Sequence, residues 1–262
     1  MSSNETTHLA IERQQIILDI LRQEGVVRTA ELKELLKVSP VTIRADLKEL
    51  ERAGECEIIW GGAVSTKPAT ERESLLEERS KIHAAEKRRI GAAAVDYIQT
   101  GQTIFVDAGS TTVELVRHLP KDLEYLRIVT PALNVAVAAS HYPDVELVMP
   151  GGVLRNLTRA LVGTQTARSM EMFNASWFFL ATGGFSIKSG ITTGNIMEVE
   201  VKRTMARRAK KCCVLADSSK HGREMSLVVM PIQNVDVLIT DTGLSDEDAS
   251  ALAAQGVEII RV

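Results

Sequence analysis

Apolar residues recur at intervals of three and four through the first 54 positions, a spacing typical of amphipathic helices. The segment 11–23 carries one such stripe, and a second predicted helix begins at Thr29, whose hydroxyl can cap it. The apolar stripe of this second helix consists of Leu32, Leu35 and Leu36. After a turn at 37–39, a third helix is expected to face the core with Ile43, Leu47 and Leu50. Three helices in this order predict a small domain with one shared core.

The third predicted helix has the features of a helix that reads DNA. Ser39 is a suitable N-cap, and Pro40 stands at the first helical position, where proline is tolerated. Two helices joined by a tight turn predict a helix-turn-helix, in which the second helix enters the major groove. Because helical spacing places these residues at its N-terminus or on its outer face, the expected DNA contacts are Ser39, Pro40, Val41, Thr42, Arg44, Ala45 and Lys48.

A short β-prone run, Glu55 to Val64, follows the helix pair and ends in two glycines. This arrangement is typical of the wing of a winged helix, which contacts backbone phosphates or the minor groove. We therefore add Trp60, Gly61 and Gly62 to the expected DNA-binding residues.

From position 87 onward, apolar strands alternate with amphipathic helices. The predicted strands are 103–106, 127–129, 145–149, 177–181, 214–216, 235–240 and 257–260, and the helices are 88–98, 111–119, 132–140, 196–209 and 246–254. This alternation predicts an α/β domain with a mostly parallel, doubly wound sheet and helices on both faces. The polar segment 65–70 is the expected linker, and 71–82 a charged connecting helix. The predicted organisation is therefore a DNA-binding domain at 1–64, a connection at 65–86 and a second domain at 87–262.

Small and polar residues follow the predicted strands of this second domain. Because the carboxyl ends of parallel strands meet at one edge of a sheet, we expect these residues to form one ligand pocket. They are Asp107, Gly109, Ser110, Thr111, Thr112, Thr130, Asn134, Gly151, Gly152, Gly183, Gly184, Asp217 and Lys220. The loop at 107–112 precedes a helix, a place where a phosphate can bind. Lys220 can pair with that phosphate, while Asp107 and Asp217 can accept hydrogens from sugar hydroxyls.

The composition of the chain is that of an ordinary α/β protein and adds little to this prediction. It has 262 residues, of which 45% are hydrophobic and 4% aromatic, as in ordinary α/β proteins. The three cysteines and five single histidines show no disulfide framework and no metal-ligand spacing. We expect no cofactor, no metal and a cytoplasmic location. The polar N-terminus is unlike a signal peptide, and no apolar run approaches transmembrane length, so no membrane partner is expected.

Charge complicates the prediction of DNA binding. Positions 1–62 hold eight Lys/Arg and eleven Asp/Glu, a net charge of −3. Since DNA affinity depends on neutralising phosphates, the bases must gather on one face. The candidates are Arg28, Arg44, Lys48 and Arg52. We expect modest affinity per monomer and a homo-oligomer, a dimer or tetramer, on repeated half-sites. A second basic cluster, 87–89, is expected to be a solvated helix start.

Several ordered motifs together resemble the DeoR family of bacterial transcription regulators along nearly the whole chain. The N-terminal similarity covers 38–47, Leu50, Glu51, Gly54 and 61–63. The C-terminal similarity covers 107–112, 129–130, 151–152, Gly163, 183–184, 198–202 and 215–220. The resemblance implies a winged helix-turn-helix joined to a sensor domain related to sugar-phosphate isomerases. It also implies a repressor of genes for sugar uptake and catabolism that responds to a phosphorylated sugar, with operator DNA as its partner. Glu198 and Lys202 join the expected effector site through this resemblance.

The chain departs from the family pattern at several of these positions. Ala45 stands where a second arginine is usual in the recognition helix, and Ile59 and Trp60 stand where Arg and His are usual in the wing. A changed operator preference is therefore expected. In the sensor, Ser110 replaces a threonine, Pro131 an asparagine and Ser176 an aspartate.

Two other functions remain open from the residues alone. A sugar-phosphate isomerase needs a general base, for which Ser176 is unsuitable, whereas Glu198 and Lys202 are possible. Their spacing of four is also that of a surface ion pair on a helix. The net negative charge of 1–62 fits a winged helix that binds protein. We expect no catalytic residue and favour the regulator.

Overall fold

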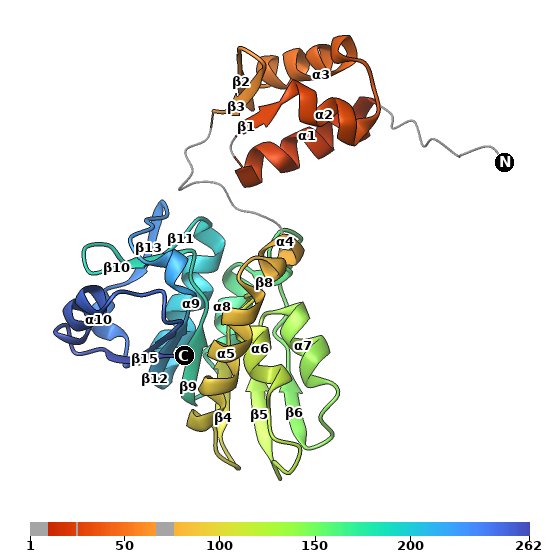
Figure 1. Ribbon diagram of the computed structural model, residues 1–262. Helices are drawn as coiled ribbons and strands as arrows, with labels where there is room; N and C mark the ends of the chain where they lie inside the picture. Colours follow the sequence, from red (N-terminus) through yellow and green to blue (C-terminus); the bar gives the residue numbers. More distant parts are fainter. Residues whose placement is uncertain (1–9, 25, 67–75) are drawn as a thin grey trace. The chain divides into compact units, whose positions relative to one another are not determined.

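The computed structural model describes residues 10–24, 26–66 and 76–262 (Figure 1). The chain divides into two units, Met1–Ser74 and Leu75–Val262. Most of the expected linker at 65–70 and the start of the connecting helix at 71–82 lie outside the described residues. The second unit begins with α4 (Leu76–Lys81), and the Leu76 amide donates to the Leu157 carbonyl over 3.0 Å. Helix α4 is therefore packed as part of the second unit.

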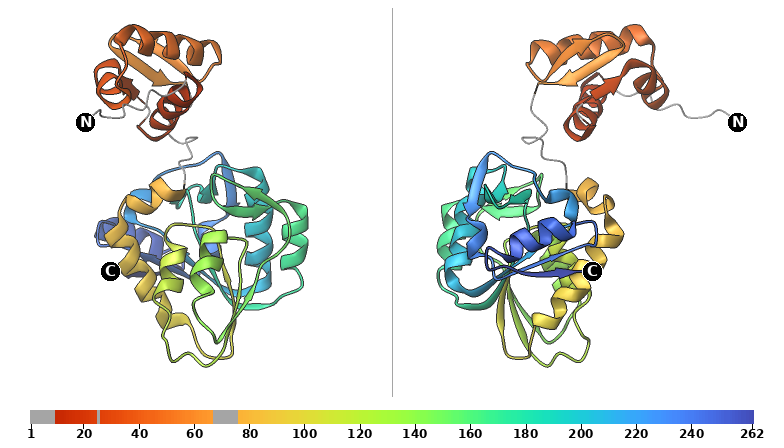
Figure 2. Two further views of the ribbon diagram at one scale, coloured as in Figure 1. Left: turned by 90° about the vertical axis from the view of Figure 1, so that its right-hand side faces the viewer. Right: turned by 60° about the vertical axis from the view of Figure 1, so that its left-hand side comes forward.

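The described part of the first unit has three helices and a small antiparallel sheet, visible from two sides in Figure 2. Its elements are α1 (Ala10–Glu24), β1 (Val26–Arg28), α2 (Thr29–Leu36), α3 (Pro40–Arg52), β2 (Cys56–Ile59) and β3 (Gly62–Ser65), with strand order β1-β3-β2. Buried side chains of all three helices share one core, among them Ile17, Leu32, Ile43 and Leu47. The predicted helix-turn-helix with a β-hairpin behind it is confirmed.

Two details of the predicted helix pair are wrong. Thr29 is the first residue of α2, and the N-cap is Arg28, whose side chain makes no capping hydrogen bond. The reason is that β1 runs directly into the helix. Leu35 is 57% exposed, because Leu32 and Leu36 occupy the side of α2 that faces the core.

The second unit is built on a seven-stranded parallel sheet with the order β15-β14-β12-β9-β4-β5-β6. These strands are β4 (Thr103–Val106), β5 (Leu126–Val129), β6 (Val145–Val148), β9 (Ala175–Leu180), β12 (Ala209–Leu215), β14 (Val237–Thr240) and β15 (Glu258–Arg261). The chain adds β5 and β6 on one side of β4, then crosses over and adds the remaining strands on the other side. The direction of winding thus reverses between β4 and β9, the place where open α/β sheets bind ligands.

Helices cover both faces of this sheet (Figure 1). On one face lie α5 (Ala84–Ala94), the short helix η2 (Val95–Tyr97), α6 (Thr112–Arg117) and α7 (Leu133–Ala139). On the other lie α8 (Thr164–Met170), α9 (Ile196–Arg208) and α10 (Asp246–Ala253). Each face has its own apolar cluster, so the strands are buried on both sides, as parallel sheets require. The doubly wound α/β prediction is confirmed.

Several short elements were not predicted. A hairpin, β7 (Val153–Arg155) and β8 (Ala160–Val162), precedes α8, and β10 (Gly184–Ser186), β11 (Gly190–Thr193) and β13 (Leu227–Met230) form a separate antiparallel sheet. The single turns η3 (Ser218–Lys220) and η4 (Ile232–Asn234) lie in loops. Across the described ranges, no helix is both long and apolar enough to cross a bilayer.

Candidate functional site

The N-terminus of α3 is capped as the sequence predicts. The Ser39 hydroxyl accepts from the Thr42 amide over 3.1 Å and also bonds the Thr42 hydroxyl at 2.9 Å. Pro40 occupies the first helical turn. The cap fixes the backbone at the end of the helix that is expected to meet base edges.

The outer face of α3 is exposed along its length. Val41 is 72% exposed, and Arg44, Ala45 and Lys48 are exposed beside it. Within the described residues Arg44 and Lys48 form no ion pair, whereas Arg52 pairs with Glu49 at 2.5 Å. Of the cations expected on this helix, Arg44 and Lys48 are therefore the two that are exposed and form no ion pair within the described residues.

A buried ion pair fastens this helix to α1. Asp46 is 3% exposed and accepts two hydrogen bonds from the Arg13 guanidinium, at 2.8 and 3.1 Å. A two-point contact of this kind fixes direction as well as distance. The Arg13–Asp46 pair therefore fixes how α3 is oriented against α1, and with it the direction in which the exposed face of α3 points.

The wing is the hairpin of β2 and β3, joined by Trp60 and Gly61. Gly61 has φ +86°, a left-handed conformation that glycine adopts easily. Gly62 lies so close to β1 that a Cβ atom would stand 1.8 Å from the Val27 carbonyl oxygen. The Thr29 amide also donates to the Gly61 carbonyl over 2.8 Å. The wing is therefore fixed tightly to the helical core.

In the second unit, a small cavity lies at the carboxyl ends of β4, β9 and β12, where the winding reverses. It is lined by Arg79, Lys87, Gly109, Ser110, Thr111, Ala181, Thr182, Leu215, Ala216, Asp217 and Lys220. Its volume is about 30 Å³, room for about two water molecules. Five of the residues expected in an effector pocket thus meet here: Gly109, Ser110, Thr111, Asp217 and Lys220.

Hydrogen bonds to neighbouring strand ends shape the loop after β4. The Thr112 hydroxyl donates to the Asp107 carbonyl over 2.8 Å, and the Asn134 amide donates to the Gly109 carbonyl over 3.0 Å. The Thr130 hydroxyl donates to the Val106 carbonyl over 2.7 Å. Thr112, Thr130 and Asn134 therefore support the loop, while Ser110 and Thr111 line the cavity.

The charges around the cavity favour an anion. Arg79, Lys87 and Lys220 line it together with a single carboxylate, that of Asp217. Burial lowers the pKa of Lys220 to about 8, against the opposing effect of Asp217. Burial also lowers the pKa of Lys87. Buried cations of this kind are stabilised when an anion enters.

Two of these cations come from the segment before the sheet and were missed in the sequence. Lys87 was expected in a solvated helix start, yet it is 4% exposed, and its Nζ donates to the carbonyls of Arg79 (2.6 Å) and Ile82 (2.5 Å). Lys87 Nζ also lies 3.9 Å from the Asp217 carboxylate. It thereby holds the C-terminal end of α4 over the cavity, with Arg79 as a lining residue. Only tertiary packing distinguishes Lys87 from the exposed cations beside it.

Three expected effector residues form a buried network outside the cavity lining. Lys202 Nζ pairs with Asp107 and donates to the Ala181 carbonyl over 3.1 Å. Glu198 accepts from the hydroxyls of Thr158 (2.8 Å) and Thr193 (3.2 Å) and from Arg155 (3.2 Å).

The spacing of Glu198 and Lys202 matched a surface ion pair, but both residues are buried. Burial opposes ionisation of Glu198, and the charges of Lys202 and Arg155 with the Thr158 hydroxyl outweigh it, which keeps the pKa of Glu198 below its usual value.

The four expected glycines of later loops do not line this cavity. Gly151 and Gly152 lie against α8, where the Thr166 hydroxyl donates to the Gly151 carbonyl over 2.8 Å. Gly183 and Gly184 pack against Met225 and Arg223. Their small size is used for close packing of loops.

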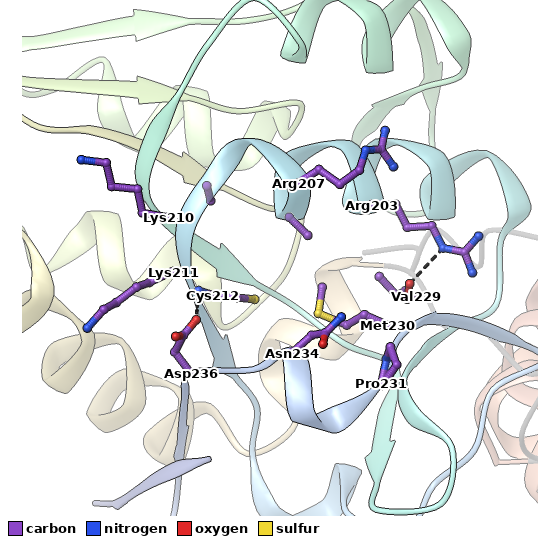
Figure 3. A pocket seen from close by; sticks show the side chains of 12 residues that line it. Arg203, Arg207, Lys210, Lys211, Cys212, Val229, Met230, Pro231, Asn234 and Asp236 are labelled. Carbon is purple, nitrogen blue, oxygen red and sulfur yellow. Dashed lines mark hydrogen bonds between the residues drawn. The ribbon is translucent and has the colours of Figure 1, made fainter. Parts of the chain in front are cut away.

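A larger hollow of about 600 Å³ lies at the opposite end of the sheet, where β12 and β14 begin (Figure 3). Its cations are Arg203, Arg207, Lys210 and Lys211. Arg203 donates to the carbonyls of Val228 and Val229, and Lys211 lies 5.3 Å from the ring centre of Trp177. Open α/β sheets bind ligands at the carboxyl ends of their strands, where the smaller cavity lies, whereas this hollow is at the amino ends. Among the described residues no group of three His, Cys, Asp or Glu is placed to hold a metal ion.

Both parts of the chain match known protein families. Residues 13–69 match the DeoR-like helix-turn-helix domain, and residues 82–242 match the DeoR C terminal sensor domain. A putative aga operon transcriptional repressor of Escherichia coli O157:H7 is 35% identical over 96% of this chain and 93% of its own length. The HTH-type transcriptional regulator GlpR of Haloferax volcanii is 34% identical over 96% of this chain and 98% of its own.

Among solved structures, the probable sor operon regulator of Shigella flexneri is 13% identical over 65% of this chain and 90% of its own, with a TM-score of 0.44. The two matched family models together span most of the described residues, and the similarity to the two regulators extends over nearly the full length of each. The chain therefore belongs to the DeoR family of transcriptional regulators.

Proposed function

We propose that this regulator represses genes of carbohydrate uptake or catabolism, and that a phosphorylated sugar in the cavity beneath α4 controls its affinity for operator DNA. The observation that carries the effector class is the cavity itself. Three cations surround one carboxylate at the point where the sheet reverses its winding, next to the Ser110 and Thr111 hydroxyls. A phosphate would add negative charge and acceptor oxygens beside these cations and hydroxyls. Repression is supported by the relative named as a repressor.

The cavity in its present form is smaller than any sugar phosphate. Binding therefore requires α4 to move, because α4 supplies Arg79 to the cavity lining. The contacts that hold α4 include the bonds from Lys87, the Leu76 amide bond to Leu157, and the ion pair of Glu77 with Arg159 at 3.2 Å. Helix α4 is the first element of the second unit after the DNA-binding unit in the chain. Its displacement gives the effector a way to favour one state of the protein over another, which any ligand control requires.

A catalytic role is less well supported than regulation. An isomerase needs a general base within hydrogen-bond reach of the substrate. The Asp217 carboxylate that lines the cavity accepts from the Ser219 hydroxyl and lies 3.9 Å from Lys87 Nζ. Asp107 is paired with Lys202, and both Glu198 oxygens accept hydrogen bonds. The sensor is thus proposed to bind its sugar without turnover, in the cytoplasm and in a homo-oligomer, a dimer or tetramer, that occupies repeated half-sites.

The test is a fluorescence-anisotropy titration of DNA from upstream of the protein's own gene, with and without a panel of pentose and hexose phosphates. Specific binding shifted by one compound is expected. Specific binding that no compound shifts would refute the effector class, and binding no tighter than to random DNA would count against this operator. Turnover of a sugar phosphate by the purified protein would contradict the regulatory assignment of the cavity.

A further inference from the structure

The tip of the wing is apolar and carries no positive charge. Trp60 is fully exposed, at 102%, and the two residues before it, Ile58 and Ile59, are 37% and 41% exposed. Positions 55–66 contain two glutamates and no lysine or arginine. Neutralising a phosphate takes a lysine or an arginine. The described wing offers neither, so any contact of this wing with DNA would be one that does not depend on a cationic side chain.

The exposed tryptophan is held in a fixed position. The turn of Trp60 and Gly61 is closed by the pairing of Ile59 with Gly62, and Gly62 is packed directly on β1. The Ile58 amide donates to the Glu51 carboxylate over 2.8 Å, which joins β2 to the recognition helix α3. The wing tip and the exposed face of α3 therefore belong to one rigid body.

Covering the Trp60 ring and the adjacent Ile58 and Ile59 side chains with a partner would remove apolar surface from water, which is favourable. Strand β2 of the wing packs against α3, the helix that carries the exposed Arg44 and Lys48, so the DNA on which α3 is proposed to lie is the partner within reach of the wing. Architectural proteins insert apolar side chains into the minor groove, where they contact sugars and wedge between base steps. The Trp60 ring is aromatic, so it can also stack on a base.

We propose that Trp60 enters the minor groove beside each half-site as an apolar wedge. This proposal depends on the DNA-binding function and adds the contact by which the wing holds the operator. It has a consequence for salt dependence. Each phosphate contact contributes about −0.9 to the slope of log affinity against log salt. A wedge contributes affinity without contributing to that slope.

The chain holds two tryptophans, which makes the wedge measurable. Trp177 lies in the second unit, 9% exposed, against Tyr97 and Phe179. In a Trp177→Phe variant with unchanged operator affinity, Trp60 is the sole indole emitter. We expect operator DNA to change its emission and to shield it from acrylamide, while sugar phosphate alone does neither.

Two variants at the same position provide the second measurement. Trp60→Ala should weaken operator binding by about tenfold, the effect of losing one stacked ring, with an unchanged salt slope. Trp60→Arg should steepen the slope by about one phosphate contact. Trp60→Phe should retain most of the affinity.

Specific operator binding with Trp60 still open to acrylamide and an unchanged Trp60→Ala affinity would overturn the wedge alone. Loss of self-association in Trp60→Ala, with equal DNA affinity per oligomer, would assign the tip to a protein contact and also overturn it. Absence of specific binding by the wild-type chain would refute the proposed function, and the wedge with it.

Discussion

Replacing Lys220 by methionine tests the effector cavity through two properties that should change in opposite directions, the affinity for the effector and the stability of the free protein. Lys220 lines the cavity, and burial lowers its pKa to about 8. Methionine removes the charge and keeps an unbranched side chain of similar length. The substitution should weaken the effector and, at the same time, stabilise the protein without effector.

The loss of effector affinity follows from the bond that is removed. A charge-assisted hydrogen bond to phosphate contributes about 1.5–3 kcal/mol, so affinity should fall by about 10- to 150-fold. Because the free protein loses the Lys220 charge above pH 8, wild-type affinity should also fall as the pH rises past 8. In Lys220→Arg this fall above pH 8 should be smaller, since the guanidinium remains charged and, of the cavity lysines, only Lys87 can then lose its charge.

The gain in stability follows from the same lowered pKa. An unfolded lysine has a pKa of about 10.4, so the folded protein binds fewer protons than the unfolded chain between pH 8 and that value. Stability contributed by this group therefore rises with pH through this window, and its cost is fully present below pH 8. A shift of this size corresponds to at most about 3 kcal/mol, and partial exposure to solvent reduces it. Lys220→Met should accordingly raise the melting temperature at pH 7.

Calorimetry supplies both readouts: titration with the sugar phosphate for affinity, and a temperature scan for stability. The matched control is Lys210→Met, an exposed lysine at the opposite end of the sheet (Figure 3), which should change neither. Equal effector affinity in wild type and Lys220→Met at pH 7, or pH profiles that coincide for wild type and Lys220→Arg, would refute the reasoning.

Three further substitutions separate the remaining roles. Arg79→Met should weaken the effector by about tenfold and leave operator affinity without effector unchanged, with Arg207→Met as control; unchanged effector binding would remove α4 from the site. Arg44→Ala should weaken operator binding by about 1–3 kcal/mol and spare the effector, and equal operator affinity would contradict its place on the recognition face. Asp46→Ala leaves the partly buried Arg13 without this carboxylate and should destabilise the first unit by up to about 3 kcal/mol in thermal unfolding, while Glu49→Gln, at an exposed pair, should cost less than about 1 kcal/mol.

The helix-turn-helix could be predicted from the sequence because its signals are local. The cap at Ser39 and the burial of Ile43, Leu47 and Leu50 follow from spacing within a single helix. Leu35 was wrongly assigned to the core, because its spacing continues the apolar stripe of α2 while its side chain lies beyond the surface that packs against the other helices. The short strands β7, β8, β10, β11 and β13 were missed because three or four residues carry little periodicity and their partners are distant.

The effector cavity could be predicted only in part, for a similar reason. Residues that directly follow adjacent strands, such as Ser110 and Asp217, meet at one sheet edge as a consequence of topology. Lys87 and Arg79 reach that edge from helices packed across it, which no local pattern encodes. Glu198 and Lys202 have the spacing of a surface pair, and only the fold determines that each is buried and has a different charged partner, Arg155 and Asp107.

The most direct test of the account measures operator affinity with increasing sugar phosphate, for wild type and Lys220→Met side by side. The account predicts equal operator affinity for the two proteins without effector, and a change in that affinity that requires about 10- to 150-fold more effector in the variant. An identical response of both proteins to the same compound would contradict the claim that this cavity controls DNA binding.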